Sequence, residues 1–317
     1  MQTAVCITEV GLRDGLQSIR TIMPTEAKCR WVDALVAAGV QEIEVGSFVS
    51  PRLLPQMADT AAVVRHARQH PGLRVVALVP NLQGALAALQ AGVHKITVPV
   101  SVSEAHSLAN VNQTHAQMLA SLARIAAQVR AHRADDNPAA PTEPVRLEVG
   151  LSTAFGCTLA GLVSEDAVIT LALACVEAGV DEVGLSDTTG MAHPAMVRQR
   201  FRRLRQELGA QAGAAHFHNT RGLGLANVLA AWDEGVRAFD SSQAGLGGCP
   251  YAPGASGNVV TEDLVFMLEA MGSATGICFD GLMRAREVLR QALPHEPLYG
   301  MTPEVGLPLG FARSHAP

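Results

Sequence analysis

Aromatic side chains are scarce in this chain of 317 residues, where Phe, Trp and Tyr together make up 4%. Hydrophobic residues still amount to 48% and charged residues to 17%, so a large buried core is feasible. With so few aromatic residues, that core must be built from Ala, Val and Leu. Such a composition favours an α/β protein with alanine-rich helices over a β-sandwich.

The chain also lacks the features that mark secreted, membrane and nucleic-acid-binding proteins. Its six cysteines are widely spaced and form no Cys-x-x-Cys pair, which predicts free thiols in a reducing cytoplasm. The N-terminus has no basic segment followed by an apolar run, and no stretch reaches the length of a membrane span. A net charge of −5 gives no electrostatic footprint for nucleic acid or an anionic membrane. We therefore expect a cytoplasmic protein that binds neither.

Short β-rich runs alternate with longer amphipathic runs along the chain, and most are bounded by Gly, Pro, Ser or Asp. The predicted strands are 4–10, 42–45, 74–79, 95–98, 146–151, 182–185, 214–218 and 238–241. The predicted helices are 25–38, 60–69, 82–90, 103–133, 164–178, 194–208, 221–234, 261–269 and 281–292. The alternation predicts parallel strands joined by helices.

One phrase occurs four times and predicts four similar helix-to-strand joints. A helical segment ends in a glycine that is followed by valine and then a strand; these glycines are Gly39, Gly92, Gly179 and Gly235. Glycine just past a helix usually adopts the left-handed conformation that ends it. Eight strand–helix units in this length predict a (β/α)8 TIM barrel. The alternative is a doubly wound sheet, but no Gly-x-Gly-x-x-Gly follows the first strand.

We expect one catalytic domain over residues 1–317. The barrel is predicted to span about 3–272, and a short C-terminal helical extension about 273–317. Since the chemistry of such barrels lies at the carboxyl ends of the strands, the residues after each strand are the candidate functional residues.

Arg13 and Asp14 follow the first strand between glycines, either as a solvated turn pair or as part of a site. His216 and His218 lie on one face of the seventh strand at its end. They are either two buried core histidines or a pair of ligands for one metal ion. Their position at a strand end favours the ligand pair.

The run 244–258 holds five glycines and two prolines around Cys249 and ends at Asn258. No strand or helix interior tolerates that composition, so it is either a surface turn or a loop that presents a thiol to a ligand. Asp14, His216, His218 and Asn258 would supply one carboxylate, two imidazoles and one amide oxygen. That mixed set suits Mg²⁺ or Mn²⁺ and leaves Cys249 free for chemistry.

Glu44 and Asp187 stand at the tips of the second and sixth strands, as cap acids or as members of the same site. An arginine, a metal, a thiol and several acids around one mouth suggest an enzyme that stabilises and protonates an enolate.

Together these residues resemble the 3-hydroxy-3-methylglutaryl-CoA (HMG-CoA) lyase family, within the metal-dependent aldol and Claisen barrel enzymes. The matching runs are 11–17 (GLRDGLQ), 46–57 (GSFVSPRLLPQM), 187–190 (DTTG), 216–218 (HFH), 240–251 (DSSQAGLGGCPY), 255–258 (ASGN) and 261–264 (TEDL). The likeness covers essentially the whole chain, and the cysteine-containing run is highly specific to the lyases.

The resemblance implies retro-Claisen cleavage of a 3-hydroxyacyl-CoA, most simply HMG-CoA to acetyl-CoA and acetoacetate. The metal ligands would be Asp14, His216, His218 and Asn258. A base, either His216 or a neighbouring acid, would take the proton of the C3 hydroxyl. Arg13 would stabilise the enolate and Cys249 would protonate it.

The resemblance also implies supporting roles around these groups. Glu44 and Asp187 would orient and assist, and Gln17 and Ser47 would join Arg13 in contacting the substrate. Arg20 would meet a phosphate of CoA. A homodimer or higher homo-oligomer is the expectation from the family.

Three departures from the family pattern bear on which acyl group the enzyme would cleave. Asn219 follows the second histidine where the lyases usually have Asp, the run 154–161 (AFGCTLAG) replaces a Gly-Cys-Pro-Tyr-Glu-Gly pattern, and Gly184 stands where serine is common. An (R)-citramalyl-CoA lyase is therefore an alternative. A condensing acyltransferase of the isopropylmalate synthase type fits less well, because such enzymes usually carry extra C-terminal sequence. A non-catalytic barrel is disfavoured, because all the proposed metal ligands are present.

Overall fold

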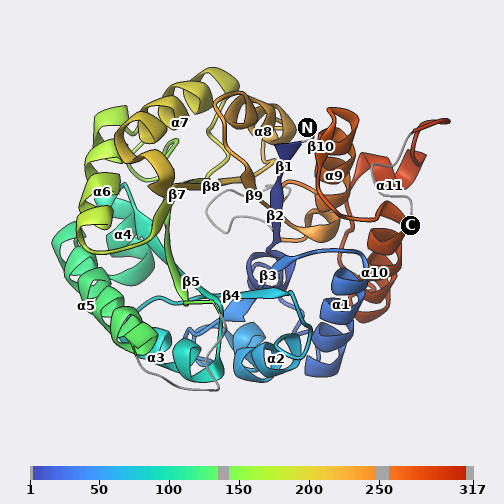
Figure 1. Ribbon diagram of the computed structural model, residues 1–317, viewed down its shortest axis with the longest axis horizontal. Coiled ribbons are helices and arrows are strands. Elements are labelled where there is room, and N and C mark those ends of the chain that lie inside the picture. The colour runs from blue at the N-terminus through green and yellow to red at the C-terminus, as the bar shows by residue number, and fades with distance from the viewer. Residues whose placement is uncertain (1–2, 135–142, 248–256, 312–317) are drawn as a thin grey trace.

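The structure is a computed structural model that describes residues 3–134, 143–247 and 257–311. Eight parallel strands close into a barrel in chain order (Figure 1). They are β2 (Cys6–Glu9), β3 (Glu42–Ser47), β4 (Arg74–Leu78), β5 (Lys95–Ser101), β6 (Arg146–Ser152), β7 (Glu182–Asp187), β8 (Ala212–Phe217) and β9 (Ala238–Ser241). The predicted TIM barrel is confirmed, and the doubly wound sheet is excluded.

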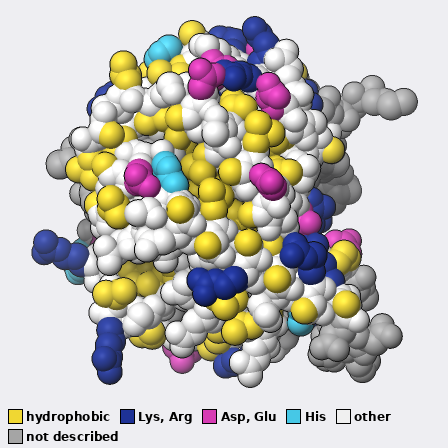
Figure 2. Space-filling view, turned by 90° about the vertical axis from the view of Figure 1, so that its left-hand side faces the viewer, with side chains coloured by type: hydrophobic (Ala, Val, Ile, Leu, Met, Phe, Trp, Pro, Cys, Tyr) yellow, Lys and Arg dark blue, Asp and Glu magenta, His cyan; other side chains and the backbone are white. Residues whose placement is uncertain are grey.

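Helices surround the barrel, as Figure 1 shows. They are α1 (Thr25–Ala37), α2 (Thr60–Ala67), α3 (Leu82–Ala91), α4 (Glu104–Val111), α5 (His115–Ala134), α6 (Glu165–Glu177), α7 (Pro194–Leu208), α8 (Gly224–Asp233) and α9 (Thr261–Ala270). On the face seen in Figure 2, basic and acidic side chains are interspersed with apolar ones, as on a solvated surface. Among the described residues, no helix combines the length and apolarity needed to cross a membrane.

The C-terminal extension consists of short elements and one longer helix. β10 (Ser273–Ala274) pairs with β1 (Thr3–Ala4), outside the barrel. α10 (Phe279–Ala292) packs against α1, and α11 (Met301–Val305) against α9. These contacts attach the extension to the outer ring of helices.

The main core lies between the barrel and the helices. Alternate strand residues such as Ile43, Val75, Ile96 and Leu147 are at most 1% exposed and face outward into this layer. The opposite side chains face the barrel interior, and many of them are polar. The apolar layer thus stabilises the closed barrel, and the polar side chains of the interior are not needed for that core.

The four predicted joints have the expected backbone. The φ angles are 93° at Gly39, 87° at Gly92, 102° at Gly179 and 86° at Gly235, all in the left-handed region. The repeated phrase was therefore a correct guide to how the helices end.

Two predicted elements were wrong in extent. The single helix 103–133 is two helices, α4 and α5, because Asn112 takes a left-handed φ of 53°. Thr114 and Gln117 then form a reciprocal cap for α5: Thr114 Oγ1 accepts from the Gln117 N–H at 3.3 Å, and Gln117 Oε1 accepts from the Thr114 N–H at 2.9 Å. The predicted strand 4–10 is divided between β1 and the barrel strand β2.

Candidate functional site

A tight turn after β2 brings Arg13 and Asp14 to the mouth of the barrel. Residues Gly11–Gly15 form one π-helical turn, in which the carbonyl of Val10 accepts the N–H groups of Asp14 at 2.7 Å and of Gly15 at 3.4 Å. A side chain at Gly11 would collide with its surroundings, since a Cβ there would lie 2.6 Å from Glu9 and 2.8 Å from Trp31. The glycine thus permits the close packing that fixes the turn.

Asp14, His216 and His218 converge at this mouth from opposite ends of the sequence. Oδ2 of Asp14 lies 3.4 Å from Nε2 of His218 and 3.9 Å from Nε2 of His216, and the two imidazole nitrogens are 3.1 Å apart. All three residues are at least nine-tenths buried. Three donor atoms of these kinds within one small space are able to hold a divalent metal ion.

Neighbouring groups fix which imidazole nitrogens face the cluster. Nδ1 of His216 lies 3.0 Å from Oδ2 of Asp240, and Nδ1 of His218 lies 3.2 Å from the carbonyl oxygen of Thr188. Both partners accept hydrogen bonds, so each Nδ1 carries the proton and each Nε2 is left as a lone-pair donor. The two histidines are therefore oriented as metal ligands.

Asn258 completes the set from the segment after the glycine-rich run. The backbone of Val259 bonds to Phe217, and that of Asn219 to Gly257, which lays Asn258 beside His218. Its Nδ2 donates to Oδ2 of Asp14 at 2.8 Å, while its Oδ1 is buried without a partner among the described residues. A half-turn of the amide would direct that oxygen toward the same carboxylate oxygen, as a fourth ligand requires. The donor set fits Mg²⁺ or Mn²⁺.

Arg13 joins the cluster to Glu44 on β3. Its Nε donates to Oε2 of Glu44 at 2.5 Å, and its Nη1 to Oδ1 of Asp14 at 2.5 Å. Burial raises the pKa of Asp14, but the Arg13 guanidinium and the two imidazoles outweigh it and hold that pKa well below its usual value. Burial raises the pKa of Glu44, which the same guanidinium opposes. Asp14 is thus ready to bind a cation.

The other residues expected to contact the substrate or CoA differ in whether they line the cavity. Gln17 lines the cavity and donates to Oδ1 of Asp14 at 2.8 Å. Ser47 is 1% exposed, contacts Thr60 through its backbone and does not line the cavity. Arg20 is exposed outside the cavity, and Cys249 lies outside the described residues.

Asp187 faces the loop that follows β7. Its Oδ1 accepts the backbone N–H groups of Met191 at 2.8 Å and Ala192 at 3.1 Å. It does not line the cavity, although Thr188 beside it does. Asp187 therefore fixes the loop whose Thr188 carbonyl orients His218.

Asp240 was not assigned a role from the sequence. Its place beside His216 depends on strand pairing, since Asp240 on β9 is the register partner of His216 on β8. It stands at a strand end like Glu44 and lines the cavity. An acid beside a strand-end histidine is the signal that would have identified it.

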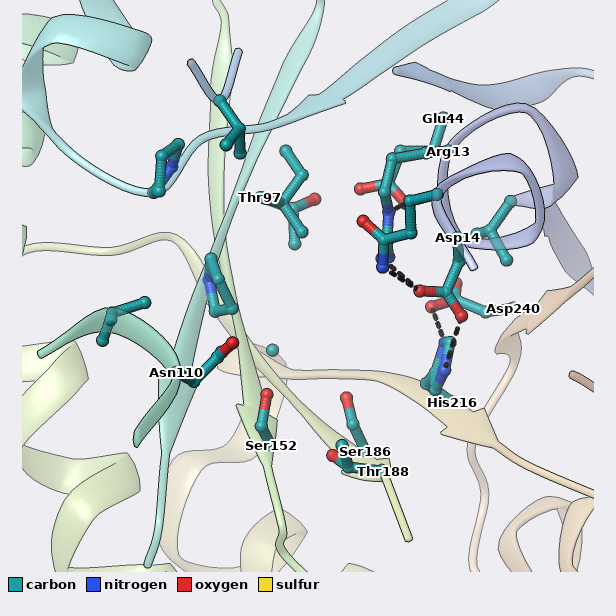
Figure 3. A pocket seen from close by; sticks show the side chains of 18 of the residues that line it. Arg13, Asp14, Glu44, Thr97, Asn110, Ser152, Ser186, Thr188, His216 and Asp240 are labelled. Carbon is teal, nitrogen blue, oxygen red and sulfur yellow. Dashed lines mark hydrogen bonds and ion pairs between the residues drawn. The ribbon is translucent and has the colours of Figure 1, made fainter. Parts of the chain in front are cut away.

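The cavity has a volume of about 800 Å³ and opens at the carboxyl ends of the strands. Figure 3 shows Arg13, Asp14, Glu44, Asp240 and His216 together on one side. Thr97, Asn110 and Ser152 lie across the open centre, whereas Ser186 and Thr188 lie nearer His216. The fold and site define a TIM-barrel protein with a candidate divalent-metal centre at the mouth of a deep polar cavity.

Comparison with known proteins places the chain in a family. The HMGL-like family matches residues 4–289, and the chain belongs to this family. It is 42% identical over 274 residues to a hydroxymethylglutaryl-CoA lyase of Pseudomonas mevalonii, covering 86% of this chain and 87% of the relative. It is 40% identical over 281 residues to a 3-hydroxy-3-isohexenylglutaryl-CoA/hydroxymethylglutaryl-CoA lyase of Pseudomonas aeruginosa, covering 89% and 90%.

A comparison with solved structures also finds an HMG-CoA lyase. An HMG-CoA lyase from Acinetobacter baumannii, in complex with coenzyme A and 3-methylmalate, superposes with a TM-score of 0.87 at 38% identity. The match covers 96% of this chain and 95% of that one.

Proposed function

We propose that this protein is a divalent-metal-dependent carbon–carbon lyase that cleaves HMG-CoA to acetyl-CoA and acetoacetate. The convergence of Asp14, His216 and His218 beside Arg13 is the observation that carries the proposal. The curated relatives named for this reaction, which match over most of the chain, support it.

The proposed metal is Mg²⁺ or Mn²⁺, held by Asp14, His216, His218 and Asn258. When bound, it would supply Lewis-acid stabilisation of substrate oxygens. The position of the Asn258 amide, 2.8 Å from Oδ2 of Asp14, supports its inclusion.

The structure favours Asp240 over His216 as the base. His216 uses Nδ1 for Asp240 and directs Nε2 at the other ligands, so neither nitrogen remains for the substrate. The Asp240 carboxylate lines the cavity and is 22% exposed. It accepts the proton of the C3 hydroxyl as that oxygen becomes the ketone of acetoacetate. The electron pair of the broken C2–C3 bond passes to the thioester as an enolate.

Arg13 stabilises the enolate oxygen, held in place by Glu44 and Asp14 on either side. Cys249 donates the proton that converts the enolate to acetyl-CoA. Gln17 contacts the acyl group from beside Asp14, and Arg20 contacts a CoA phosphate outside the cavity. Asp187 acts by positioning the Thr188 loop, and Ser47 receives no substrate contact in this proposal.

A shorter acyl group is the second candidate. The lyase from A. baumannii was solved with coenzyme A and 3-methylmalate, a hydroxy-dicarboxylate with a four-carbon backbone. Citramalyl-CoA carries an acyl group of similar length, so citramalyl-CoA lyase activity with release of pyruvate belongs in the same test.

We propose a cytoplasmic homo-oligomer as the working form. The cysteines that the structure describes are all unpaired, which is typical of reducing compartments. Met301, Val305 and Leu309 on the C-terminal extension are at least 78% exposed, and a second copy of the chain would cover such apolar side chains. Light scattering of the purified protein tests the oligomer.

The reaction is tested by measuring acetyl-CoA release from HMG-CoA and from citramalyl-CoA, with added Mn²⁺. The proposal expects HMG-CoA to have the higher kcat/KM of the two. A higher value for citramalyl-CoA would establish the second candidate, and no release from either would refute the lyase.

A further inference from the structure

The interior of the barrel is unusually open on one side. Barrel interiors of this type are normally filled by branched apolar side chains. Here the inward positions on β6, β7 and β8 include Gly150, Gly184 and Ala214, and all three line the cavity. The space therefore continues past the metal centre toward the middle of the barrel.

Three hydroxyl groups line this space, and one of them, on Ser186, lies beside the proposed metal centre because Ser186 is the register partner of His216. Thr97 on β5, Ser152 on β6 and Ser186 on β7 direct their hydroxyls into the open centre (Figure 3). Within the described ranges, none of these three hydroxyls has a protein hydrogen-bond partner. The three hydroxyls are therefore able to bond to a ligand. An apolar group placed against them would remove their water without offering a new hydrogen bond, which costs free energy.

Charged residues close the inner end of the cavity, but they are already paired. Nζ of Lys95 lies 2.5 Å from Oε1 of Glu42 and 2.9 Å from Oε2 of Glu148. Nη1 of Arg74 also lies 3.0 Å from Oε2 of Glu42, so both cations of this cluster are already paired with its two acids. A long apolar chain would meet charged groups, and a second carboxylate would find no unpaired cation there.

Resting on the lyase function proposed above, we infer that the space lined by Thr97, Ser152 and Ser186 is a subsite for a C3 substituent larger than methyl. The substituent it fits is uncharged and carries a hydrogen-bonding group, such as a hydroxyalkyl chain. The substrate class is thus a 3-hydroxyacyl-CoA with a polar branch at C3. The relative from P. aeruginosa is named for a branched apolar substituent, isohexenyl.

The test compares three glutaryl-CoA substrates that differ only at C3: 3-hydroxy-3-methyl, 3-hydroxy-3-(hydroxypropyl) and 3-hydroxy-3-butyl. The last two are matched in size and differ in one hydroxyl. We expect the hydroxypropyl compound to exceed the butyl compound about tenfold in kcat/KM, as one or two hydrogen bonds would give. The variants Thr97→Val, Ser152→Ala and Ser186→Ala should each reduce that ratio about threefold or more.

A Gly150→Ala variant separates size from polarity. Its Cβ would lie 3.5 Å from Oγ of Ser186, an ordinary contact, so the variant should fold. It should lower kcat/KM for both larger substrates relative to the methyl compound and leave their mutual ratio nearly unchanged. Equal cleavage of the butyl and hydroxypropyl compounds, or cleavage of the methyl compound alone, would overturn the subsite and leave the lyase standing. No cleavage of any of the three would instead remove the lyase itself.

A separate cluster on the outside of the barrel carries a second inference. Asp33 on α1 lies between His66 on α2 and His70 just beyond it. Its Oδ1 is 2.6 Å from Nε2 of His66 and 2.7 Å from Nε2 of His70. All three side chains remain partly exposed, at 45%, 29% and 26%. One carboxylate oxygen and two imidazole nitrogens thus converge at a place that solvent ions reach.

We infer that Asp33, His66 and His70 form a second metal site that binds Zn²⁺ and links α1 to α2. Two imidazoles and one carboxylate are ligands that Zn²⁺ accepts, with water in the fourth position. Tetrahedral bonds to zinc separate ligand atoms by about 3.3 Å, so Asp33 needs to retreat less than about 1 Å. Binding to the folded state alone would raise the melting temperature.

The test is the zinc stoichiometry of the full chain after dialysis against Zn²⁺. We expect two zinc ions per wild-type chain, one in His70→Gln and one in His218→Gln. Zinc should also raise the melting temperature of His218→Gln, in which only the outer site remains. An unchanged stoichiometry in His70→Gln, or a single wild-type ion that is lost in His218→Gln, would overturn the outer site.

Discussion

Nδ1 of His216 lies 3.0 Å from Oδ2 of Asp240, and the two residues are register partners on adjacent strands. This pairing gives the imidazole a fixed tautomer, with Nε2 directed at Asp14 and His218. The proposed metal centre would therefore depend on a carboxylate that is not one of its ligands.

The first prediction concerns that pairing. Asp240→Asn should weaken metal affinity about 10- to 100-fold, because the amide no longer enforces one tautomer. It should also lower kcat at saturating metal, because the proposed base is lost. Isothermal titration with Mn²⁺ separates the two effects. Asp233→Asn, which alters a surface pair with Arg198, is the matched control and should leave both quantities within twofold.

The second prediction concerns Arg13. Arg13→Lys should reduce kcat roughly 100-fold, because a single ammonium group cannot contact Glu44 and Asp14 and still face the enolate. The loss should fall mainly on kcat, with KM little changed. Arg198→Lys on the surface is the control. A kcat near the wild-type value would show that Arg13 is only a structural partner of the two acids.

The third prediction concerns pH and the inner end of the cavity. Burial raises the pKa of the Glu148 carboxyl to about 7, although Lys95 opposes the shift. An acid with a raised pKa in the folded state stabilises the fold at low pH and loses that contribution as the pH rises through the folded pKa. The contribution of Glu148 to the free energy of unfolding should therefore decrease between about pH 4.5 and pH 7.

Glu148→Gln should remove up to about 3 kcal/mol of that decrease. Urea unfolding at a series of pH values measures it. Glu287→Gln, at a surface pair with Arg290, should leave the pH dependence as in the wild type. Parallel curves for the wild type and Glu148→Gln would contradict the assigned pKa.

The fourth prediction concerns Cys249, in the run that the sequence singled out. Cys249→Ser should cut turnover severely while metal affinity stays near the wild-type value, because a hydroxyl is a far weaker acid than a thiol. Cys175 serves as a comparison: Cys175→Ser alters a fully buried free thiol and should affect stability more than kcat. Unchanged turnover in Cys249→Ser would remove this residue as the acid.

The alternation of strands and helices and the four glycine joints were enough to predict the barrel, because both depend on local sequence. The break between α4 and α5 was missed, since Asn112 and the Thr114–Gln117 cap are weak signals within a helical pattern. Local patterns also did not separate β1 from β2, because the division depends on the pairing of β1 with β10 near the other end of the chain.

Part of the site was also predictable, because some of its residues are marked by local sequence. Asp14, His216 and His218 follow from strand ends, which a barrel brings together. Asp240 requires the register of β8 against β9, and the enclosed position of Ser47 depends on Thr60 in a neighbouring helix. Such relationships between separate segments are absent from any local pattern.

The central claim is that Asp14, His216 and His218 hold a metal on which cleavage depends. The most direct measurement is acetyl-CoA release from HMG-CoA by chelator-treated protein as Mn²⁺ is titrated back, for the wild type and for His218→Ala. The account predicts no release without metal, recovery with one equivalent of Mn²⁺ in the wild type, and little recovery in His218→Ala at the same concentration. Full activity in the chelated protein, or equal recovery in His218→Ala, would contradict it.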